Sequence, residues 1–178
     1  LFNVDWCCTG VFNIILLSPM ISDDDFKFLL EESRYAKKIL EIGTGTGKST
    51  TALIANRAEV HTIDKDNIFQ YIGIEDSINR YHCKSSEYWK LEGVPFEFDF
   101  VFVDGAIGVY DCEEILKRTT DHFKIIFHDY LPDEEKYPGR NKGWYNMETF
   151  KKASFLKYDL RIKTGGTHCG LIELNKDV

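Results

Sequence analysis

The chain of 178 residues lacks the features that would place it in a membrane or on a nucleic acid. Its longest apolar stretch, residues 11–21, contains Asn13 and Pro19 and is too short to span a bilayer. No basic residue precedes Lys27, so the positive region of a signal peptide is missing. The formal net charge is −7, whereas a dedicated nucleic-acid binder usually shows a basic face. We therefore expect a globular protein without a membrane segment or a nucleic-acid partner.

Paired cysteines, repeats and linkers are missing as well. The five cysteines are scattered and form no Cys-x-x-Cys pair, which argues against a zinc site. An odd number of cysteines without regular spacing predicts reduced thiols in a cytoplasmic protein. With no repeat and no linker, we expect one domain over residues 1–178, in which residues 1–37 form a segment and a helix that precede the sheet.

Glycine and hydroxyl side chains are instead concentrated in one stretch. The apolar run Lys38–Ile42 leads into a turn with three alternating glycines, which are Gly43, Gly45 and Gly47. A hydroxyl-rich segment, Ser49–Thr51, then opens an apolar helix. Strand, glycine turn and helix start form the first βα unit of a doubly wound sheet. Such a turn lets a ligand approach the backbone, and the free N–H groups of the helix start attract a negative ligand group.

Two common phosphate-binding patterns do not fit this turn. A Walker A loop needs its first glycine at position 42, which is Ile42. The dinucleotide fingerprint Gly-x-Gly-x-x-Gly needs a glycine at position 48, which is Lys48. The pattern that remains is Glu-x-Gly-x-Gly-x-Gly, from Glu41 to Gly47.

This pattern resembles motif I of the class I S-adenosylmethionine (SAM)-dependent methyltransferases. The resemblance implies that the three glycines approach SAM, that Glu41 lies near its amino end, and that Ser49 and the helix start take its carboxylate. Thr44 and Lys65 are further candidate contacts of this cofactor. One rival interpretation is a NAD(P)-binding oxidoreductase, and another is a SAM-binding protein that has lost catalysis.

The rest of the chain alternates between strand and helix patterns and ends in a hairpin signal. We predict a Rossmann-like α/β fold with a doubly wound, mixed sheet of seven strands, the last two forming a C-terminal β-hairpin. In the fourth strand, the alternating phenylalanines from Phe96 to Phe102 are predicted to share one face. The predicted strands are Lys38–Ile42, Glu59–Ile63, Ile78–Cys83, Phe96–Val103, Lys124–Phe127, Leu156–Lys163 and Cys169–Leu174. The predicted helices are residues 23–36, Ser49–Asn56, an irregular segment at 66–80, Glu87–Leu91, Asp111–His122 and Trp144–Ala153, with Leu131–Gly143 as a loop.

Polar or glycine residues follow five of the predicted strands. Ligands of such sheets bind outside the carboxyl ends of the strands, where these residues should meet. Asp64 follows the glycines by about twenty residues, where an acid accepts hydrogen bonds from ribose hydroxyls; the alternative is an ordinary surface acid. Class I methyltransferases contact the adenine end at the position of Ser85. The five positions are Gly43, Asp64, Ser85, Asp104 and Asp129.

Asp104 follows Phe-Val-Phe-Val and precedes Gly105. This segment resembles the Val-Asp-Gly/Ala motif of small-molecule O-methyltransferases of the catechol-type and sugar-modifying groups. Several of these relatives bind a divalent cation with this acid and with acids after the next strand, so Asp104 and Asp129 are candidate Mg²⁺ ligands. Mg²⁺ takes oxygen ligands and lowers the pKa of a bound hydroxyl. The sequence departs from those relatives at Ile107, because the Lys or His that takes the proton in them is absent there.

His128 stands beside Asp129, where relatives often carry Glu or another side chain. It is a candidate general base or a mixed metal ligand, and the alternative is a strand-end histidine bonded to its neighbours. Together with Asp104, these residues are the predicted catalytic group. We predict that the chain catalyses SAM-dependent O-methylation and that its partner is a small hydroxylated molecule, the methyl acceptor. Mg²⁺ is a candidate second cofactor. The sequence is compatible with a homo-oligomer.

Overall fold

The apolar run before the glycine turn forms β1 (Lys38–Ile42), an inner strand of a seven-stranded sheet. The computed structural model describes residues 21–66, 68–69, 77–131, 141–154 and 159–176. The strand order is β3-β2-β1-β4-β5-β7-β6, in which β1 to β5 run parallel and β7 is antiparallel to both β5 and β6. The predicted Rossmann-like fold with a C-terminal hairpin is therefore confirmed.

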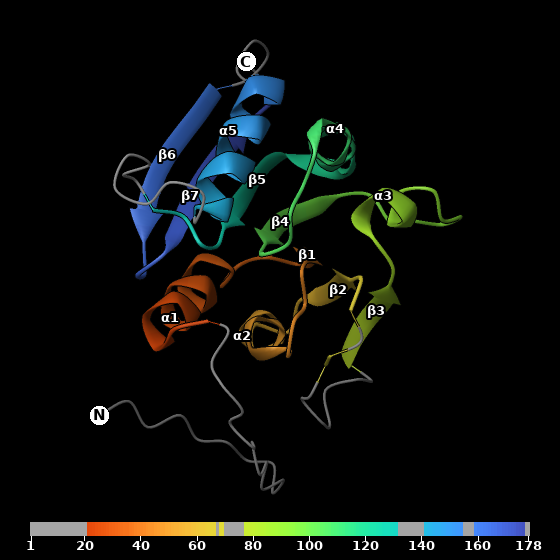
Figure 1. The fold of residues 1–178 in the computed structure, drawn as a ribbon, viewed down its shortest axis with the longest axis horizontal. Coiled ribbons are helices and arrows are strands. Elements are labelled where there is room, and N and C mark those ends of the chain that lie inside the picture. Colours follow the sequence, from red (N-terminus) through yellow and green to blue (C-terminus); the bar gives the residue numbers. More distant parts are fainter. Residues whose placement is uncertain (1–20, 67, 70–76, 132–140, 155–158, 177–178) are drawn as a thin grey trace, which may run out of the picture.

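Helices cover both faces of this sheet (Figure 1). The remaining strands are β2 (Glu59–Asp64), β3 (Ile78–His82), β4 (Phe98–Val103), β5 (Thr119–Phe127), β6 (Asp159–Gly165) and β7 (Cys169–Asn175). The helices are α1 (Asp23–Glu32), α2 (Lys48–Ile54), α3 (Ser85–Tyr88), α4 (Val109–Arg118) and α5 (Lys142–Ser154).

Alternating apolar side chains of the strands feed two separate cores. On one face, Leu40 and Ile42 of β1 pack in a cluster that includes residues of α3, α4 and α5. On the other face, Ile39 packs in a cluster with residues of α1 and α2. A sheet that is apolar on both faces must be covered on both faces. The carboxyl ends of its strands, where the polar residues lie, stay open.

The ends of the elements differ from prediction where long-range pairing decides them. The helix predicted for Asp111–His122 ends at Arg118, because residues 119–123 already belong to β5. Thr119 pairs with Phe98, and His122 pairs with Asn175 of β7. These partners are far away in sequence, and pairing with them overrides the local helical pattern.

The predicted face of four phenylalanines is also only partly correct. Phe100 and Phe102 pack in the cluster of α1 and α2. Phe98 packs in the opposite cluster, and the pairing of β4 with β5 shifts register between Phe98 and Phe100. Phe96 lies outside the strand and is exposed. Strict alternation therefore holds only over the regularly paired end of β4.

Some predicted segments fall on residues outside the described part. These include most of the N-terminal segment (residues 1–20), residues 67 and 70–76 of the predicted irregular helix, and residues 132–140 of the predicted loop. Within the described part, residues 78–80, where the predicted helix and the predicted strand Ile78–Cys83 overlap, belong to strand β3. Lys142 and Gly143 are the start of α5 rather than loop.

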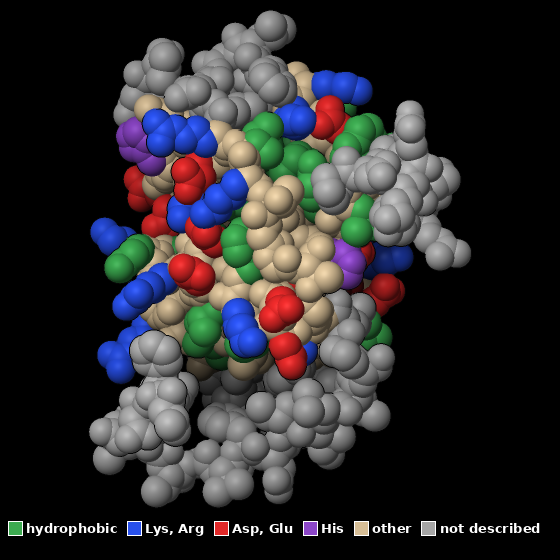
Figure 2. Space-filling model, turned by 90° about the vertical axis from the view of Figure 1, so that its left-hand side faces the viewer, with side chains coloured by type: hydrophobic (Ala, Val, Ile, Leu, Met, Phe, Trp, Pro, Cys, Tyr) green, Lys and Arg blue, Asp and Glu red, His purple; other side chains and the backbone are tan. Residues whose placement is uncertain are grey.

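Acidic and basic side chains are interspersed on the face that carries α1 and the β6–β7 hairpin (Figure 2). Glu32 of α1 illustrates this mixture, since it pairs with Lys124 of β5 and Lys163 of β6. Over the described residues, every helix is too short or too polar to cross a membrane.

Candidate functional site

The glycine turn is built so that β1 and β4 end against each other. Gly43 has a φ of +96°, a conformation that favours glycine. A Cβ at this position would lie 2.4 Å from the Gly105 nitrogen, so no larger residue fits without a shift. The Gly105 N–H donates to the Ile42 carbonyl at 2.7 Å, which fastens the end of β4 to that of β1. Asp104 is thereby held beside the turn.

A cavity of about 690 Å³ lies at the carboxyl ends of these strands. Its volume is within the range of roughly 300–1,000 Å³ that small-ligand sites occupy. All five predicted strand-end positions line it, together with Lys65 and with Lys142, which was not predicted. These lining residues are Gly43, Gly45, Asp64, Lys65, Ser85, Asp104, Asp129 and Lys142.

Asp64 closes the turn from the neighbouring strand. One carboxylate oxygen accepts the Gly45 N–H at 2.7 Å, and the other accepts the Asp66 N–H at 2.7 Å. Each carboxylate oxygen has two lone pairs, so Asp64 can still accept hydrogen bonds from a ligand in the cavity.

Glu41 directly precedes Ile42 and Gly43, which line the cavity, and its side chain is completely buried. Its carboxyl group accepts hydrogen bonds from Ser49 at 2.5 Å and from Thr50 and Thr62, each at 2.6 Å. Burial raises the pKa of Glu41 to about 7, although these hydroxyl donors oppose the shift. Thr44 bonds to Thr62 in the same buried group. In this arrangement Glu41 and Ser49 anchor the start of α2 to β1 and β2.

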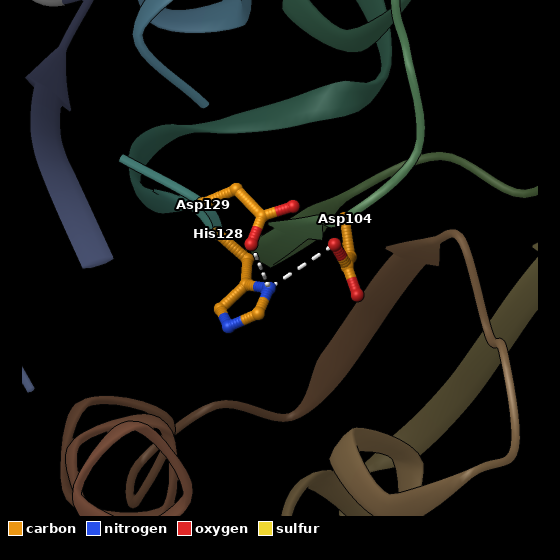
Figure 3. A group of neighbouring side chains, drawn as sticks. All are labelled: Asp104, His128 and Asp129. Carbon is orange, nitrogen blue, oxygen red and sulfur yellow. Dashed lines mark hydrogen bonds and ion pairs between the residues drawn. The ribbon is translucent and has the colours of Figure 1, made fainter. Parts of the chain in front are cut away.

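The other predicted residues converge at the ends of β4 and β5. The His128 Nδ1 lies 3.1 Å from the Asp104 Oδ1 and 3.6 Å from the Asp129 Oδ1 (Figure 3). The side chain of Asp129 is 47% exposed, whereas those of Asp104 and His128 are 15% and 5% exposed. Asp129 adopts a φ of +57°, which Asp tolerates better than most residues. The most accessible carboxylate of the group is therefore that of Asp129.

His128 is enclosed by carboxylates on both sides. Its Nε2 lies 3.6 Å from the Oδ2 of Asp25, a fully buried residue of α1. Burial alone would lower the pKa of His128, but the hydrogen bonds to Asp104 and Asp25 outweigh it and raise the pKa to about 9. Burial likewise opposes ionisation of Asp25, yet the bond to His128 and the N–H groups of His168 and Thr167 hold its pKa well below the usual range. The carboxylates on both sides of the ring therefore favour the protonated form of His128.

Two residues of this group, Asp25 and Lys142, were not predicted as site residues from the sequence. Asp25 belongs to an acidic cluster, Asp23–Asp25, that is typical of a helix start. Only its tertiary contacts distinguish its role from that of the two neighbouring acids. Lys142 reaches the group from α5, and its ammonium lies 3.0 Å from the Asp104 Oδ1 and 3.2 Å from the Asp129 Oδ2. Burial would lower the pKa of Lys142, but the two carboxylates outweigh it and raise the pKa.

The predicted metal ligands are close together but already have partners. Asp104, His128 and Asp129 each place a ligand atom within 4.8 Å of the others, which would suffice for a divalent cation. However, both ring nitrogens of His128 already face carboxylates, and the Lys142 ammonium lies between the carboxylates of Asp104 and Asp129. The three ligand atoms alone would therefore fit a divalent cation. Because the two carboxylates are already paired with the Lys142 ammonium, their charge does not require a metal ion as well.

Comparison with solved structures identifies the fold. An O-methyltransferase from Bacillus cereus in complex with SAH has a TM-score of 0.69 and 21% identity, with 90% of this chain and 84% of that chain covered. The O-methyltransferase TomG from Streptomyces achromogenes, in complex with SAM, has a TM-score of 0.62 and 18% identity, with coverages of 88% and 81%.

Another solved structure carries the same fold with a different reaction. Spermidine synthase from Thermotoga maritima has a TM-score of 0.62 and 14% identity, with 87% of this chain and 60% of that chain covered. No protein-family model and no curated protein matches the chain. The resemblance to class I methyltransferases predicted from Glu41–Gly47 is therefore confirmed at the level of the fold.

Proposed function

We propose that the chain is a SAM-dependent O-methyltransferase acting on a small hydroxylated molecule. One observation carries the proposal: the glycine turn, Asp64 and the carboxylates of Asp104 and Asp129 line the same cavity. A nucleoside with an activated methyl group and an acceptor with a hydroxyl group would be held side by side there. The SAH and SAM complexes of the two O-methyltransferases with this fold support the choice of ligand.

The residues of the cavity fit SAM from two sides. Gly43 and Gly45 expose backbone without a side chain, and Asp64 has unused lone pairs for the ribose hydroxyls. Lys65 and Ser85 line the same cavity and are candidates for the remaining contacts with the nucleoside. When bound, SAM supplies a methyl group whose bond to sulfur breaks while the electron pair stays on the sulfur.

The chain's own task is to align the acceptor and to remove its proton. We assign the role of proton acceptor to Asp129, because its carboxylate is the most exposed of the group and faces the cavity. The acceptor oxygen forms its bond to the methyl carbon as its proton passes to Asp129. Both ring nitrogens of His128 face carboxylates, which supports a positioning role for this residue rather than a role as base.

Ligand binding tests the proposal first. Isothermal titration calorimetry with SAH, SAM, NAD⁺ and ATP should detect SAH and SAM only. Binding of NAD⁺ without SAH would overturn the proposal in favour of an oxidoreductase.

A screen of hydroxylated acceptor classes for SAH release then tests the reaction. SAH binding without release by any acceptor would point to a catalytically inactive binding protein. Release of methylthioadenosine in place of SAH would show that the three-carbon amino acid chain of SAM, and not its methyl group, is transferred.

A further inference from the structure

The ammonium group of Lys142 lies between the two carboxylates at which related sites would place a metal. Its distances to the Asp104 Oδ1 and the Asp129 Oδ2 are 3.0 and 3.2 Å, so it is within hydrogen-bonding range of both. The Lys142 side chain is 39% exposed and lines the cavity. A monovalent cation thus bridges the two acids on the ligand side of the site.

This position is imposed by the backbone around Lys142. The Gly143 N–H donates to the Asp129 carbonyl at 3.2 Å. A Cβ on Gly143 would lie 2.2 Å from the His128 carbonyl oxygen, so only glycine permits this approach. On the other side, the buried Asn141 accepts the Leu131 N–H at 2.8 Å. The segment 141–143 is therefore held against the residues that follow β5, and Lys142 is directed at the acids.

The surrounding charges leave little reason for a divalent cation. Three acids, Asp25, Asp104 and Asp129, lie around His128, and the Lys142 ammonium lies 3.0 and 3.2 Å from two of them. A metal ion bound by Asp104 and Asp129 would have to displace the Lys142 ammonium and tolerate it nearby. Like charges at such short distance repel strongly in a partly buried site.

We infer that Lys142 takes the place of a divalent metal between Asp104 and Asp129, so that the site works without one. An ammonium has three N–H donors, and two carboxylates are its partners among the described residues. The third N–H can be offered to the hydroxyl oxygen of a methyl acceptor, where it stabilises negative charge that develops as the proton leaves. Only this catalytic part of the inference rests on the proposed function.

Metal titration of the whole chain tests the inference without reference to activity. Calorimetry with MnCl₂ is run on the wild type, on Lys142→Met and on the double variant Lys142→Met/Asp129→Asn. The matched control is Lys117→Met, which removes an exposed lysine paired with Glu114 at 2.8 Å, outside the cavity. We expect Lys142→Met to bind Mn²⁺ at least about tenfold more tightly than the wild type and the control, because a repelling charge beside the ligands is gone. The double variant should lose this gain.

Equal Mn²⁺ affinity of the wild type and Lys142→Met, whether both bind or neither does, would overturn the inference. Should Lys142→Met fail to fold, Lys142→Gln replaces it, and the wild-type titration remains decisive because tight Mn²⁺ binding by the wild type contradicts the inference. Turnover of the wild type is also measured in EDTA, where we expect it to persist. Loss in EDTA with recovery on Mg²⁺ would reject the inference while leaving the proposed methyl transfer intact.

Discussion

At the scale of single residues, Glu41, which precedes the glycine turn, makes the stability of the fold depend on pH. Its carboxyl group is fully buried and is held by three hydroxyl donors, and its pKa is raised to about 7. An acid with a raised pKa in the folded state favours folding most below its ordinary pKa of 4.5, and this contribution is lost as the pH rises through 7.

We therefore predict that Glu41 lowers the free energy of unfolding by about 3 kcal/mol between pH 4.5 and pH 8. Glu41→Gln stays neutral over this range and should lack that part of the pH dependence. Urea unfolding of both proteins at several pH values measures it, and other titrating groups such as His128 cancel in the difference. A difference between the two proteins that does not change with pH would contradict the prediction.

Asp64 is the residue expected to distinguish a nucleoside site from an empty strand edge. Asp64→Ala should weaken SAH binding by about 1–3 kcal/mol, because the ligand hydroxyls would lose a hydrogen-bond partner. The control is Asp66→Ala, which changes an exposed neighbour that also lines the cavity. It should change SAH affinity by less than about 0.5 kcal/mol.

Calorimetry on both variants separates the two acids. If Asp66→Ala lowered the affinity and Asp64→Ala did not, the ribose contact would belong to Asp66. Since Asp64 also accepts the Gly45 N–H, melting temperatures of the variants are compared to confirm that the turn remains folded.

At the scale of elements, the start of α5 decides the composition of the site. Its first residues lie against the residues after β5, and the contact depends on Gly143. Gly143→Ala introduces a methyl group about where the His128 carbonyl oxygen lies. We predict that it lowers the free energy of unfolding by about 1–3 kcal/mol, as overpacking does. Turnover should fall by about a factor of 100, because Lys142 and Asp129 would be displaced together.

Gly108→Ala is the matched control, since a Cβ there would meet only the Asp111 Oδ2 at 3.8 Å. Urea unfolding and SAH-release rates of the two variants provide the measurements. Equal stability of Gly143→Ala and the control would show that α5 docks without this close approach, and Lys142 would then be free to move.

At the scale of the whole molecule, the strand order gathers the site at one edge. Because β1 lies between β2 and β4, the polar residues that follow these strands surround a single cavity. A ligand in this cavity bridges several elements and binds only the folded chain. SAH at a hundredfold excess over its Kd should therefore raise the free energy of unfolding by about 2.7 kcal/mol.

Thermal unfolding in the presence of SAH, NAD⁺ or no ligand measures this effect. For a domain of this size, the gain corresponds to an increase of about 5–10 °C in Tm. NAD⁺ at the same concentration should leave Tm unchanged, and the reverse pattern would refute the assignment of SAM to the cavity.

The amino-acid sequence by itself determined the first βα unit and the sheet to which it belongs. β1 was predicted with its observed bounds, Lys38–Ile42, and the strand-end positions from Gly43 to Asp129 were all predicted to meet at one edge. These features depend on local rules: alternating apolar residues form strands, glycines permit tight turns, and parallel strands end on the same side.

Only the tertiary structure decided which charged partners complete the site. Asp25 and Lys142 look like an ordinary helix-start acid and a lysine near a loop, and they reach His128 and Asp104 only because α1 and α5 pack against distant strands. The same long-range pairing extended β5 back to Thr119 against a helical pattern. Contacts between residues tens of positions apart depend on how whole faces pack, and no local spacing encodes them.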